Sequence, residues 1–191
     1  GDLKNYNVLE IGPGPGSLTR SILEAGARKV IVVEKDMRFV PALLELKSFY
    51  NERLEIINDD ILKFNKIPIQ EFPVKVIANL PYNIGTQILI NFLTQWSFPK
   101  IWTSLTLMFQ QEVANRIISK PGSKAYGRLS ILSQFVSEVE LMFHVSADVF
   151  TPVPKVDSSV LNFTPILEKK YNCNFSLLEK IVKLAFNKRR K

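Results

Sequence analysis

Residues 76–83, Val-Ile-Ala-Asn-Leu-Pro-Tyr-Asn, are the stretch from which the fold class of this 191-residue chain can be inferred. The apolar run through Ala78 predicts the end of a buried strand, because polar and proline residues stop it abruptly. Pro81 fixes its own φ and moves Leu80 away from helical geometry, so the turn should be stiff and extended. A turn of this kind at the carboxyl end of a strand is where open α/β sheets bind ligands.

The same turn carries groups that suit a planar ligand. Asn79 offers an amide acceptor, the turn leaves backbone carbonyls free, and Tyr82 offers a flat stacking face. Together they fit a ring with an exocyclic NH2, such as adenine. An ordinary strand-to-helix turn explains these residues equally well, so both interpretations stay open at this point.

Working outward, short apolar strands alternate with helical segments. Strands are expected at residues 7–11, 30–34, 54–57, 74–78, 102–109, 139–145 and 159–163. Helices are expected at residues 18–25, 37–49, 84–96, 112–118 and 129–136, and from 176 onward. Ser17 or Thr19 is expected to cap the first helix. The alternation predicts an α/β fold with right-handed crossovers and a mostly parallel sheet, and the last two strands should form an antiparallel edge hairpin.

Composition sets the broad class. A chain of 191 residues with 46% hydrophobic and 23% charged residues fits one globular domain with a short appendage. No apolar run approaches the roughly 20 residues of a membrane span. Cys173 is alone, so no internal disulfide is possible and a reducing cytoplasm is expected. His144 is also alone, which argues against a metal site or a Ser-His-Asp triad, and Trp96 and Trp102 are assigned to the core.

The net charge of +7 is unevenly distributed. Residues 188–191 are all basic, and a second group gathers within one short region, at Arg116, Lys120, Lys124 and Arg128. A basic surface attracts phosphate backbones and binds them in a salt-dependent way. A merely solvated surface is the alternative, so charge indicates nucleic acid as a class of partner and no particular reaction.

A glycine loop follows the first strand. Gly12, Gly14 and Gly16 lie where glycine lets the backbone approach a ligand closely. The intervening residues are prolines without an N–H, whereas a dinucleotide site holds pyrophosphate with backbone N–H groups. Glu10 would also oppose a pyrophosphate. The loop therefore suits a nucleoside ligand without phosphates, preferably a cation such as S-adenosylmethionine.

Acids follow the next two strands. Glu34 lies about 20 residues beyond the loop, where an acid accepts hydrogen bonds from both ribose hydroxyls. Asp60 is predicted to end the third strand, where a carboxylate could accept from an adenine amino group. Each acid alone is more often a solvated or capping residue, but glycines, Glu and Asp at three successive strand ends favour a nucleoside site. A nicotinamide dehydrogenase is the second choice at this stage.

Four motifs now occur in order: Leu-Glu-Ile-Gly-Pro-Gly-Pro-Gly at 9–16, Asn-Leu-Pro-Tyr-Asn at 79–83, Ser-Lys-Ala-Tyr-Gly-Arg-Leu-Ser at 123–130, and Phe-Thr-Pro-Val-Pro-Lys-Val-Asp-Ser at 150–158. With them the chain resembles the rRNA adenine N6,N6-dimethyltransferases, which modify two adjacent adenosines near the 3′ end of small-subunit rRNA. The ending Phe-Asn-Lys-Arg-Arg-Lys at 186–191 is similar to the family's entry into its C-terminal helical domain.

The resemblance implies a Rossmann-like methyltransferase fold with a seven-stranded, mostly parallel sheet and helices on both faces. Residues 1–167 would form the catalytic domain, and residues 168–191 a linker and the first helix of the C-terminal domain. The family's N-terminal Gly-Gln-Asn-Phe-Leu segment and most of its C-terminal domain are missing, so we expect an excerpt of a longer protein. The family also implies S-adenosylmethionine as cofactor and small-subunit rRNA in a pre-ribosomal particle as partner. We expect a cytoplasmic monomer that binds neither membrane nor metal.

The resemblance further assigns roles to single residues. Gly12 would lie against the cofactor, Glu34 would hold its ribose, and Asp60 its adenine amine. The full set of implied cofactor contacts is Glu10, Gly12, Gly14, Gly16, Glu34, Lys35, Asp60, Ile61 and Asn79.

The implied catalytic residues are Asn79, Leu80, Pro81, Tyr82 and Phe150. Asn79 would sit between the cofactor and the target amine, and Tyr82 and Phe150 would stack on the two faces of the base. Spacing alone would instead make Phe150 a core anchor for its proline-rich loop. Acceptors from Asn79 and the Leu80 carbonyl would favour a pyramidal, nucleophilic amine, and no strong base is needed because the sulfonium is a good leaving group.

Three alternatives remain at this stage. The antibiotic-resistance methyltransferases that modify adenine in large-subunit rRNA share the architecture and the chemistry. A DNA adenine or protein-glutamine methyltransferase fits less well, since Leu80 stands where those enzymes usually carry proline. The protein could also act mainly as an RNA-binding ribosome assembly factor with secondary methylation.

Overall fold

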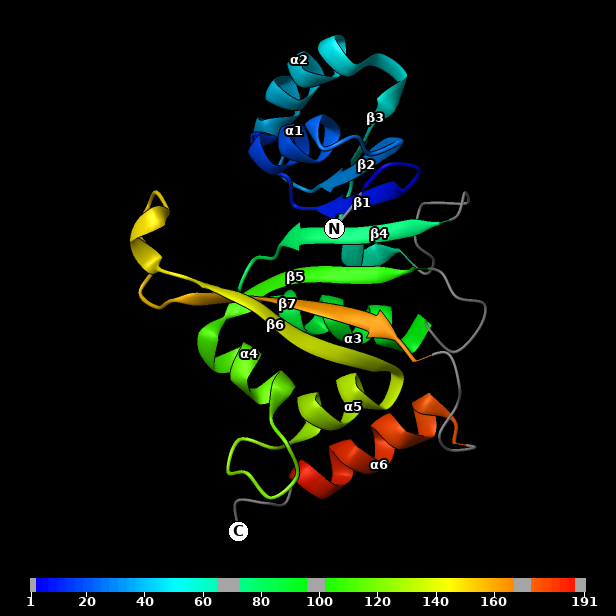
Figure 1. The fold of residues 1–191 in the computed structure, drawn as a ribbon, viewed down its shortest axis with the longest axis vertical. Helices are drawn as coiled ribbons and strands as arrows, with labels where there is room; N and C mark the ends of the chain where they lie inside the picture. The colour runs from blue at the N-terminus through cyan, green and yellow to red at the C-terminus, as the bar shows by residue number, and fades with distance from the viewer. Residues whose placement is uncertain (1–2, 65–72, 96–101, 167–172, 188–191) are drawn as a thin grey trace. The chain divides into compact units, whose positions relative to one another are not determined.

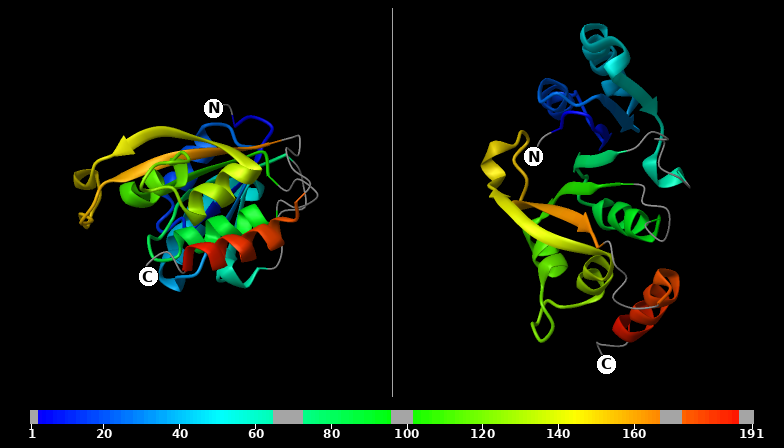
Figure 2. Two further views of the ribbon diagram at one scale, coloured as in Figure 1. Left: turned by 90° about the horizontal axis from the view of Figure 1, so that it is seen from below. Right: turned by 45° about the vertical axis from the view of Figure 1, so that its right-hand side comes forward.

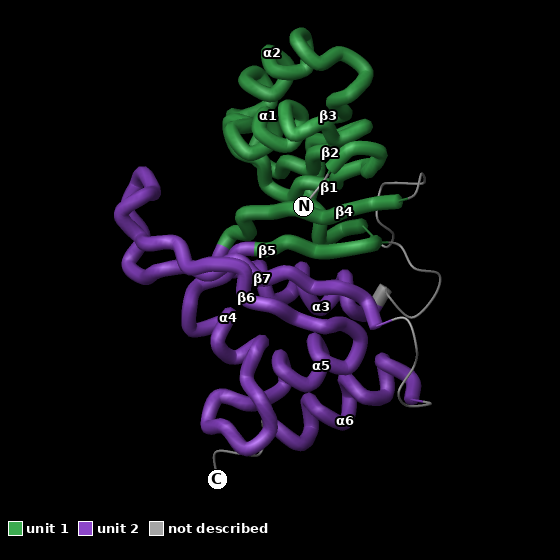
Figure 3. Tube along the Cα trace, viewed as in Figure 1, with its two compact units in different colours: residues 1–81, 101–107 green, residues 82–100, 108–191 purple. Residues whose placement is uncertain are grey.

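The structure is a computed structural model that describes residues 3–64, 73–95, 102–166 and 173–187 (Figure 1). It divides into two compact units, which Figure 3 colours separately. The first unit comprises residues 1–81 and 101–107, and the second comprises residues 82–100 and 108–191.

Four parallel strands form the sheet of the first unit. They are β1 (Asn7–Ile11), β2 (Lys29–Glu34), β3 (Leu54–Asn58) and β4 (Val74–Asn79). Strand β1 pairs with β2 on one side and β4 on the other, and β3 pairs with β2. All five residues of β1 are buried, as is typical of a parallel strand that has a neighbouring strand on each side. This register brings the carboxyl ends of β1, β2 and β4 to one edge.

Two longer helices pack on this sheet, α1 (Ser17–Glu24) and α2 (Val40–Tyr50). Short 3-10 turns complete the unit: η1 (Met37–Phe39), η2 (Asn51–Arg53) and η3 (Ile61–Lys63). Ile22 and Leu23 of α1 and Leu43 and Leu46 of α2 are buried in one cluster with the strands. The prediction that Ser17 or Thr19 caps α1 is wrong: the N-cap is Gly16, which makes no side-chain hydrogen bond.

In the described residues, the second unit combines α-helices with an antiparallel hairpin (Figures 1 and 2). Its helices are α3 (Gly85–Gln95), α4 (Gln111–Ile118), α5 (Arg128–Val136) and α6 (Phe175–Asn187). Its strands are β6 (Ser137–Val145) and β7 (Ser158–Pro165), with η4 (Ala147–Val149) between them. The predicted edge hairpin is confirmed, with one register shift between Leu141 and Phe143. Helix α5 contacts α3, α4 and α6 and so forms the centre of the helical layer.

Strand β5 (Ser104–Gln110) completes a seven-stranded sheet of order β3-β2-β1-β4-β5-β7-β6. The predicted α/β class and strand count are confirmed. Trp102 is buried as expected, with 1% of its surface exposed. Trp96, the predicted domain boundary at residue 168 and the basic residues 188–191 lie outside the described residues. None of the helices in the described ranges is both long and apolar enough to span a membrane.

Candidate active site

The glycine loop turns the chain from β1 into α1 in the first unit. The Gly12 N–H donates to the Val33 carbonyl over 2.9 Å, which ties the start of the loop to β2. Gly14 has a φ of 55° and open space where a side chain would begin. Gly16 has a φ of 91°, and a Cβ there would lie 3.1 and 3.2 Å from the methyl carbons of Leu43 and Leu46. At Gly14 the positive φ alone favours glycine, whereas at Gly16 packing against α2 excludes a side chain in addition to the positive φ.

Glu10 lies beneath this loop as a buried acid. It is 1% exposed, and the Thr19 hydroxyl donates to its Oε2 over 2.6 Å. Burial raises the pKa of Glu10 to about 7, although the Thr19 hydrogen bond opposes the shift. Glu34 adds a smaller repulsion in the same direction. The carboxyl is thus poised to ionise when a positive charge arrives nearby.

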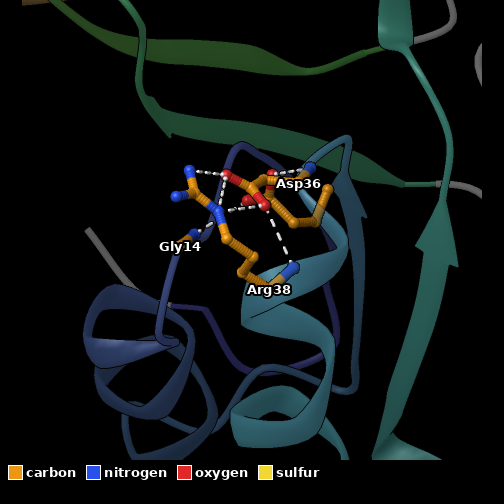
Figure 4. A network of polar contacts seen from close by, with 4 residues as sticks. Gly14, Asp36 and Arg38 are labelled. Carbon is orange, nitrogen blue, oxygen red and sulfur yellow. Dashed lines mark hydrogen bonds and ion pairs between the residues drawn. The ribbon is translucent and has the colours of Figure 1, made fainter.

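Glu34 joins the glycine loop to the end of β2. Its Oε2 accepts the Gly14 N–H over 3.0 Å and its Oε1 accepts the Asp36 N–H over 2.7 Å. The Asn58 side chain donates to the Glu34 carbonyl over 2.7 Å. Figure 4 shows that the Arg38 guanidinium donates hydrogen bonds to both carboxylate oxygens of Asp36. Two backbone N–H groups therefore orient the Glu34 carboxylate, and each of its oxygens keeps a lone pair for a further donor.

Asp60 lies two residues beyond β3, so the prediction that it ends the strand is wrong. Its Oδ1 accepts the Leu62 N–H over 2.9 Å and caps η3, and its Oδ2 pairs with the Lys35 ammonium over 2.8 Å. The Lys35 hydrogen bond lowers the pKa of Asp60. Lys35 and Asp60, predicted as cofactor contacts, are thereby brought together, with Ile61 half-buried beside them.

The turn after β4 separates a buried anchor from an exposed amide. Leu80 is 2% exposed, whereas Asn79 and Pro81 are exposed. Within the described ranges the Asn79 carboxamide has no hydrogen-bond partner. The Pro81 ring lies 3.9 Å from the position of a Cβ on Gly12, so the turn and the glycine loop meet at the same edge of the sheet. The Asn79 amide is therefore free to bind a ligand there.

In the second unit, Tyr82 is held by its hydroxyl. The Tyr82 oxygen lies 2.7 Å from that of Ser158, a fully buried residue at the start of β7. Phe150 is half-buried directly after η4, and its N–H donates to the Ala147 carbonyl over 3.2 Å. Sequence reasoning assigned no role to Ser158, although it ends the fourth motif, because its partner is 76 residues away.

Asp157 fixes the loop that carries Phe150. Its carbonyl accepts the Gln111 N–H over 2.9 Å, and its Oδ1 accepts the Ala147 N–H over 2.9 Å. These two hydrogen bonds therefore connect the end of the loop to α4 and to Ala147, near the start of the loop. In the described part of the chain, no group of three His, Cys, Asp or Glu side chains could hold a metal ion.

This geometry, a carboxylate-lined glycine loop beside a free strand-end amide, agrees with comparisons with known proteins. The family model for ribosomal RNA adenine dimethylase matches residues 3–191. The ribosomal RNA small subunit methyltransferase A of Ruegeria pomeroyi is 49% identical over all 191 residues, which cover 68% of that relative. The protein of the same name from Roseobacter denitrificans is 50% identical, with the same coverage.

Solved structures give the same result. A dimethyladenosine transferase from Plasmodium falciparum has a TM-score of 0.82 at 30% identity, over 99% of this chain and 66% of that one. The 23S rRNA methyltransferase ErmE has a TM-score of 0.77 at 28% identity, over 97% and 72%. The chain thus spans about two thirds of its relatives' length. The family model, in contrast, covers almost every residue of this chain, and the resemblance inferred from the motifs is confirmed. The chain therefore belongs to the ribosomal RNA adenine dimethylase family, a family of S-adenosylmethionine-dependent methyltransferases.

Proposed function

We propose that the protein transfers methyl groups from S-adenosylmethionine to N6 of two adjacent adenosines near the 3′ end of small-subunit rRNA. The product is N6,N6-dimethyladenosine, made on a pre-ribosomal particle in the cytoplasm. The observation that carries the proposal is the free, exposed amide of Asn79 at the same sheet edge as the glycine loop and Glu34. The 49% identity to a small-subunit rRNA methyltransferase supports the choice of substrate.

The residues of the glycine loop fit S-adenosylmethionine better than a phosphate-bearing nucleotide. Pro13 and Pro15 contribute no N–H to a phosphate, and the buried Glu10 favours a positive charge. Glu34 would accept from the ribose hydroxyls, and Asp60 from the adenine amine. Lys35 and Ile61 would flank the adenosine, and the cofactor would supply an electrophilic methyl group on a sulfonium.

Asn79 and Leu80 would prepare the target amine. The N6 lone pair is delocalised into the adenine ring, so the amine is a poor nucleophile while it stays planar. The Asn79 side-chain oxygen and the Leu80 carbonyl would each accept one N6 hydrogen and favour a pyramidal nitrogen. No histidine is required, because the proton can leave after methyl transfer, when the nitrogen has become acidic.

The remaining residues would hold the base. Pro81 stiffens the turn, and Tyr82 and Phe150 would stack on the two faces of the adenine. Stacking on one aromatic ring contributes roughly 1–3 kcal/mol per base. Two rings would thus offset the few kcal/mol needed to take the base out of its stack.

A large-subunit rRNA methyltransferase is the second candidate, because ErmE shares the fold at 28% identity. The test offers the full-length protein under-methylated small and large ribosomal subunits with labelled S-adenosylmethionine, and then maps the modified adenines. We expect label on two adjacent adenosines of the small-subunit rRNA. Label on the large subunit alone would establish the second candidate, and label on neither would overturn both.

An RNA-binding assembly role with secondary methylation makes a different prediction. If assembly were the main role, Asn79→Ala would restore small-subunit maturation in cells that lack the protein. We expect this variant to bind the particle and yet leave the two adenosines unmodified.

A further inference from the structure

The second unit holds a cavity that the residues assigned to methyl transfer do not line. Its volume is about 660 Å³, within the roughly 300–1,000 Å³ range of small-molecule sites. One side of α4, the loop that follows it, the first turn of α5 and the last turn of α6 form its walls. The side chains that matter here are Asn115, Arg116, Lys124, Tyr126, Arg128 and Phe186.

Positive charge dominates the lining. The lining holds three cations, Arg116, Lys124 and Arg128, and one carboxylate, Glu112. Arg116 pairs with Glu112 over 2.6 Å on an exposed stretch of α4, where solvent screens the attraction and keeps the pair weak. Arg128 pairs with Glu179 over 2.7 Å. Lys124 makes no ion pair in the described part of the chain, so the cavity has a cation left for an anionic ligand.

The walls are held together by partly buried polar contacts. The Ser130 hydroxyl is fully buried and donates to the Arg116 carbonyl over 2.5 Å, while it accepts the Gly127 N–H over 3.1 Å. The Gln134 amide donates to the carbonyls of Ile117 and Ser119, each over 2.9 Å. Helix α4, the loop and α5 are thereby joined, so little ordering would be needed on binding.

Aromatic rings complete the lining. The Phe186 ring lies beside Gly127, 3.7 Å from the position of a Cβ on that residue, and Tyr126 precedes it in the loop. Cations beside aromatic rings are the combination that binds a phosphate and stacks a base. The Asn115 amide adds both a donor and an acceptor for a base edge.

We propose that this cavity binds one nucleotide of the RNA other than the adenosine that is methylated. Its phosphate would lie against Lys124, with Arg116 and Arg128 nearby, and its base against Tyr126 or Phe186. The proposal rests on RNA being the substrate, as argued above. The cavity would then help to fix the register of the RNA rather than take part in the chemistry.

The test measures affinity of the full-length protein for under-methylated small subunits over a salt series. Removal of one phosphate-binding cation should reduce the slope of log affinity against log salt by about 0.7–0.9. We expect Lys124→Ala to weaken binding and to reduce the slope by about that amount. Lys120→Ala is the matched control, because Lys120 is an exposed lysine of the same loop that does not line the cavity.

A second variant separates the contribution of base stacking to RNA affinity from that of phosphate binding. Phe186→Ala should lower affinity while the salt slope stays unchanged, and Phe186→Leu controls for weaker packing against Gly127. Unfolding midpoints show that each variant is folded. Equal behaviour of the Lys124 and Lys120 variants would overturn the proposal. A second outcome would also overturn the proposal: 5′-AMP binds the unmodified protein but not Lys124→Ala, while the RNA affinity is unaffected by 5′-AMP. That result would assign the cavity to a free nucleotide.

Failure of this proposal and failure of the proposed function are distinguishable. If only the cavity proposal fails, the unmodified protein still labels the two small-subunit adenosines, and Lys124→Ala labels them at the same RNA concentration. If the function itself fails, the unmodified protein labels neither adenosine.

Discussion

The phenolic oxygen of Tyr82 lies 2.7 Å from the hydroxyl of Ser158, and this bond holds the ring from its far end. Ser158 is fully buried, whereas 37% of the Tyr82 surface is exposed. A partly exposed ring whose hydroxyl is held in place is pre-organised for stacking, because less rotamer freedom is lost when a base arrives. Ser158 is thus a positioning residue for the proposed base site.

Tyr82→Phe removes the bond and keeps the ring, whereas Tyr82→Ala removes both. A hydrogen bond contributes about 0.5–1.5 kcal/mol, so we expect Tyr82→Phe to raise the KM for RNA about 2- to 10-fold with kcat little changed. Ser158→Ala should match it, and the double variant should be no worse than either. Tyr82→Ala and Phe150→Ala should lose more, again in RNA kinetics. Steady-state kinetics with a small-subunit substrate measure all of these.

Ser159→Ala is the control for that series. Ser159 is also fully buried, and it bonds to the His144 ring over 2.9 Å instead of to Tyr82. The base-stacking role is refuted if Tyr82→Ala and Phe150→Ala both keep normal RNA kinetics. The positioning role fails if Ser158→Ala behaves like Ser159→Ala.

Asn79→Ala should lower turnover on the order of 10²–10³-fold, the scale for one hydrogen bond that stabilises a transition state. The cofactor affinity should change much less, because Glu34 and Asp60 remain. Single-turnover methylation and calorimetric titration of S-adenosylmethionine separate the two effects. Asn83→Ala, an exposed amide four residues later, is the control. Near-normal turnover of Asn79→Ala would disprove the assigned role.

Glu10 should make stability depend on pH. Its pKa is raised from 4.5 to about 7 in the folded protein, so between these values the folded chain holds a proton that the unfolded chain has lost. Its contribution to stability is therefore full below pH 4.5 and is lost as the pH rises through 7. The loss is on the order of 3 kcal/mol for a shift of this size. Glu10→Gln still accepts from Thr19 but cannot ionise, so denaturation between pH 4 and 8 should show no such loss.

The same group should couple cofactor binding to proton release. A cation near Glu10 favours the carboxylate, so binding of S-adenosylmethionine at pH 6–7 should expel a proton. Calorimetry in buffers of different ionisation enthalpy measures the number of protons released per bound cofactor. The unmodified protein should release a fraction of one proton and Glu10→Gln much less. Equal release by both proteins would show that Glu10 does not sense the cofactor.

Glu34→Gln should loosen the glycine loop. Glutamine has one acceptor oxygen, so it can keep the Gly14 or the Asp36 N–H but not both. A buried N–H without an acceptor costs about 1–3 kcal/mol, and because both bonds are only partly buried we expect a stability loss near the lower end of that range, with weaker cofactor binding. Asp36→Asn alters the half-buried neighbour that pairs with Arg38 but keeps the Asp36 N–H, so it should do little. Denaturation with and without cofactor measures the stability of the Glu34→Gln and Asp36→Asn variants and the extra stability that the cofactor gives to each.

The sequence patterns located the strands well because β1 and β2 are short, mainly apolar and followed by glycine or charge. Local preference failed where a tertiary contact took precedence. Thr19 looked like a helix cap, but the fold uses its hydroxyl to satisfy the buried Glu10. Ser158 carried no local signal, since its partner Tyr82 is distant in sequence. The cavity beside Lys124 could not be predicted for the same reason: three helices and a loop build it together.

The three glycines of the loop look equivalent in the sequence, yet the structure predicts different tolerance to substitution. At Gly14 only the positive φ excludes other residues, and asparagine adopts that conformation at modest cost. At Gly16 even alanine would press on Leu43 and Leu46 in addition to straining the backbone. In a saturation library selected for a folded protein, position 14 should therefore return asparagine alongside glycine, whereas position 16 should return glycine alone.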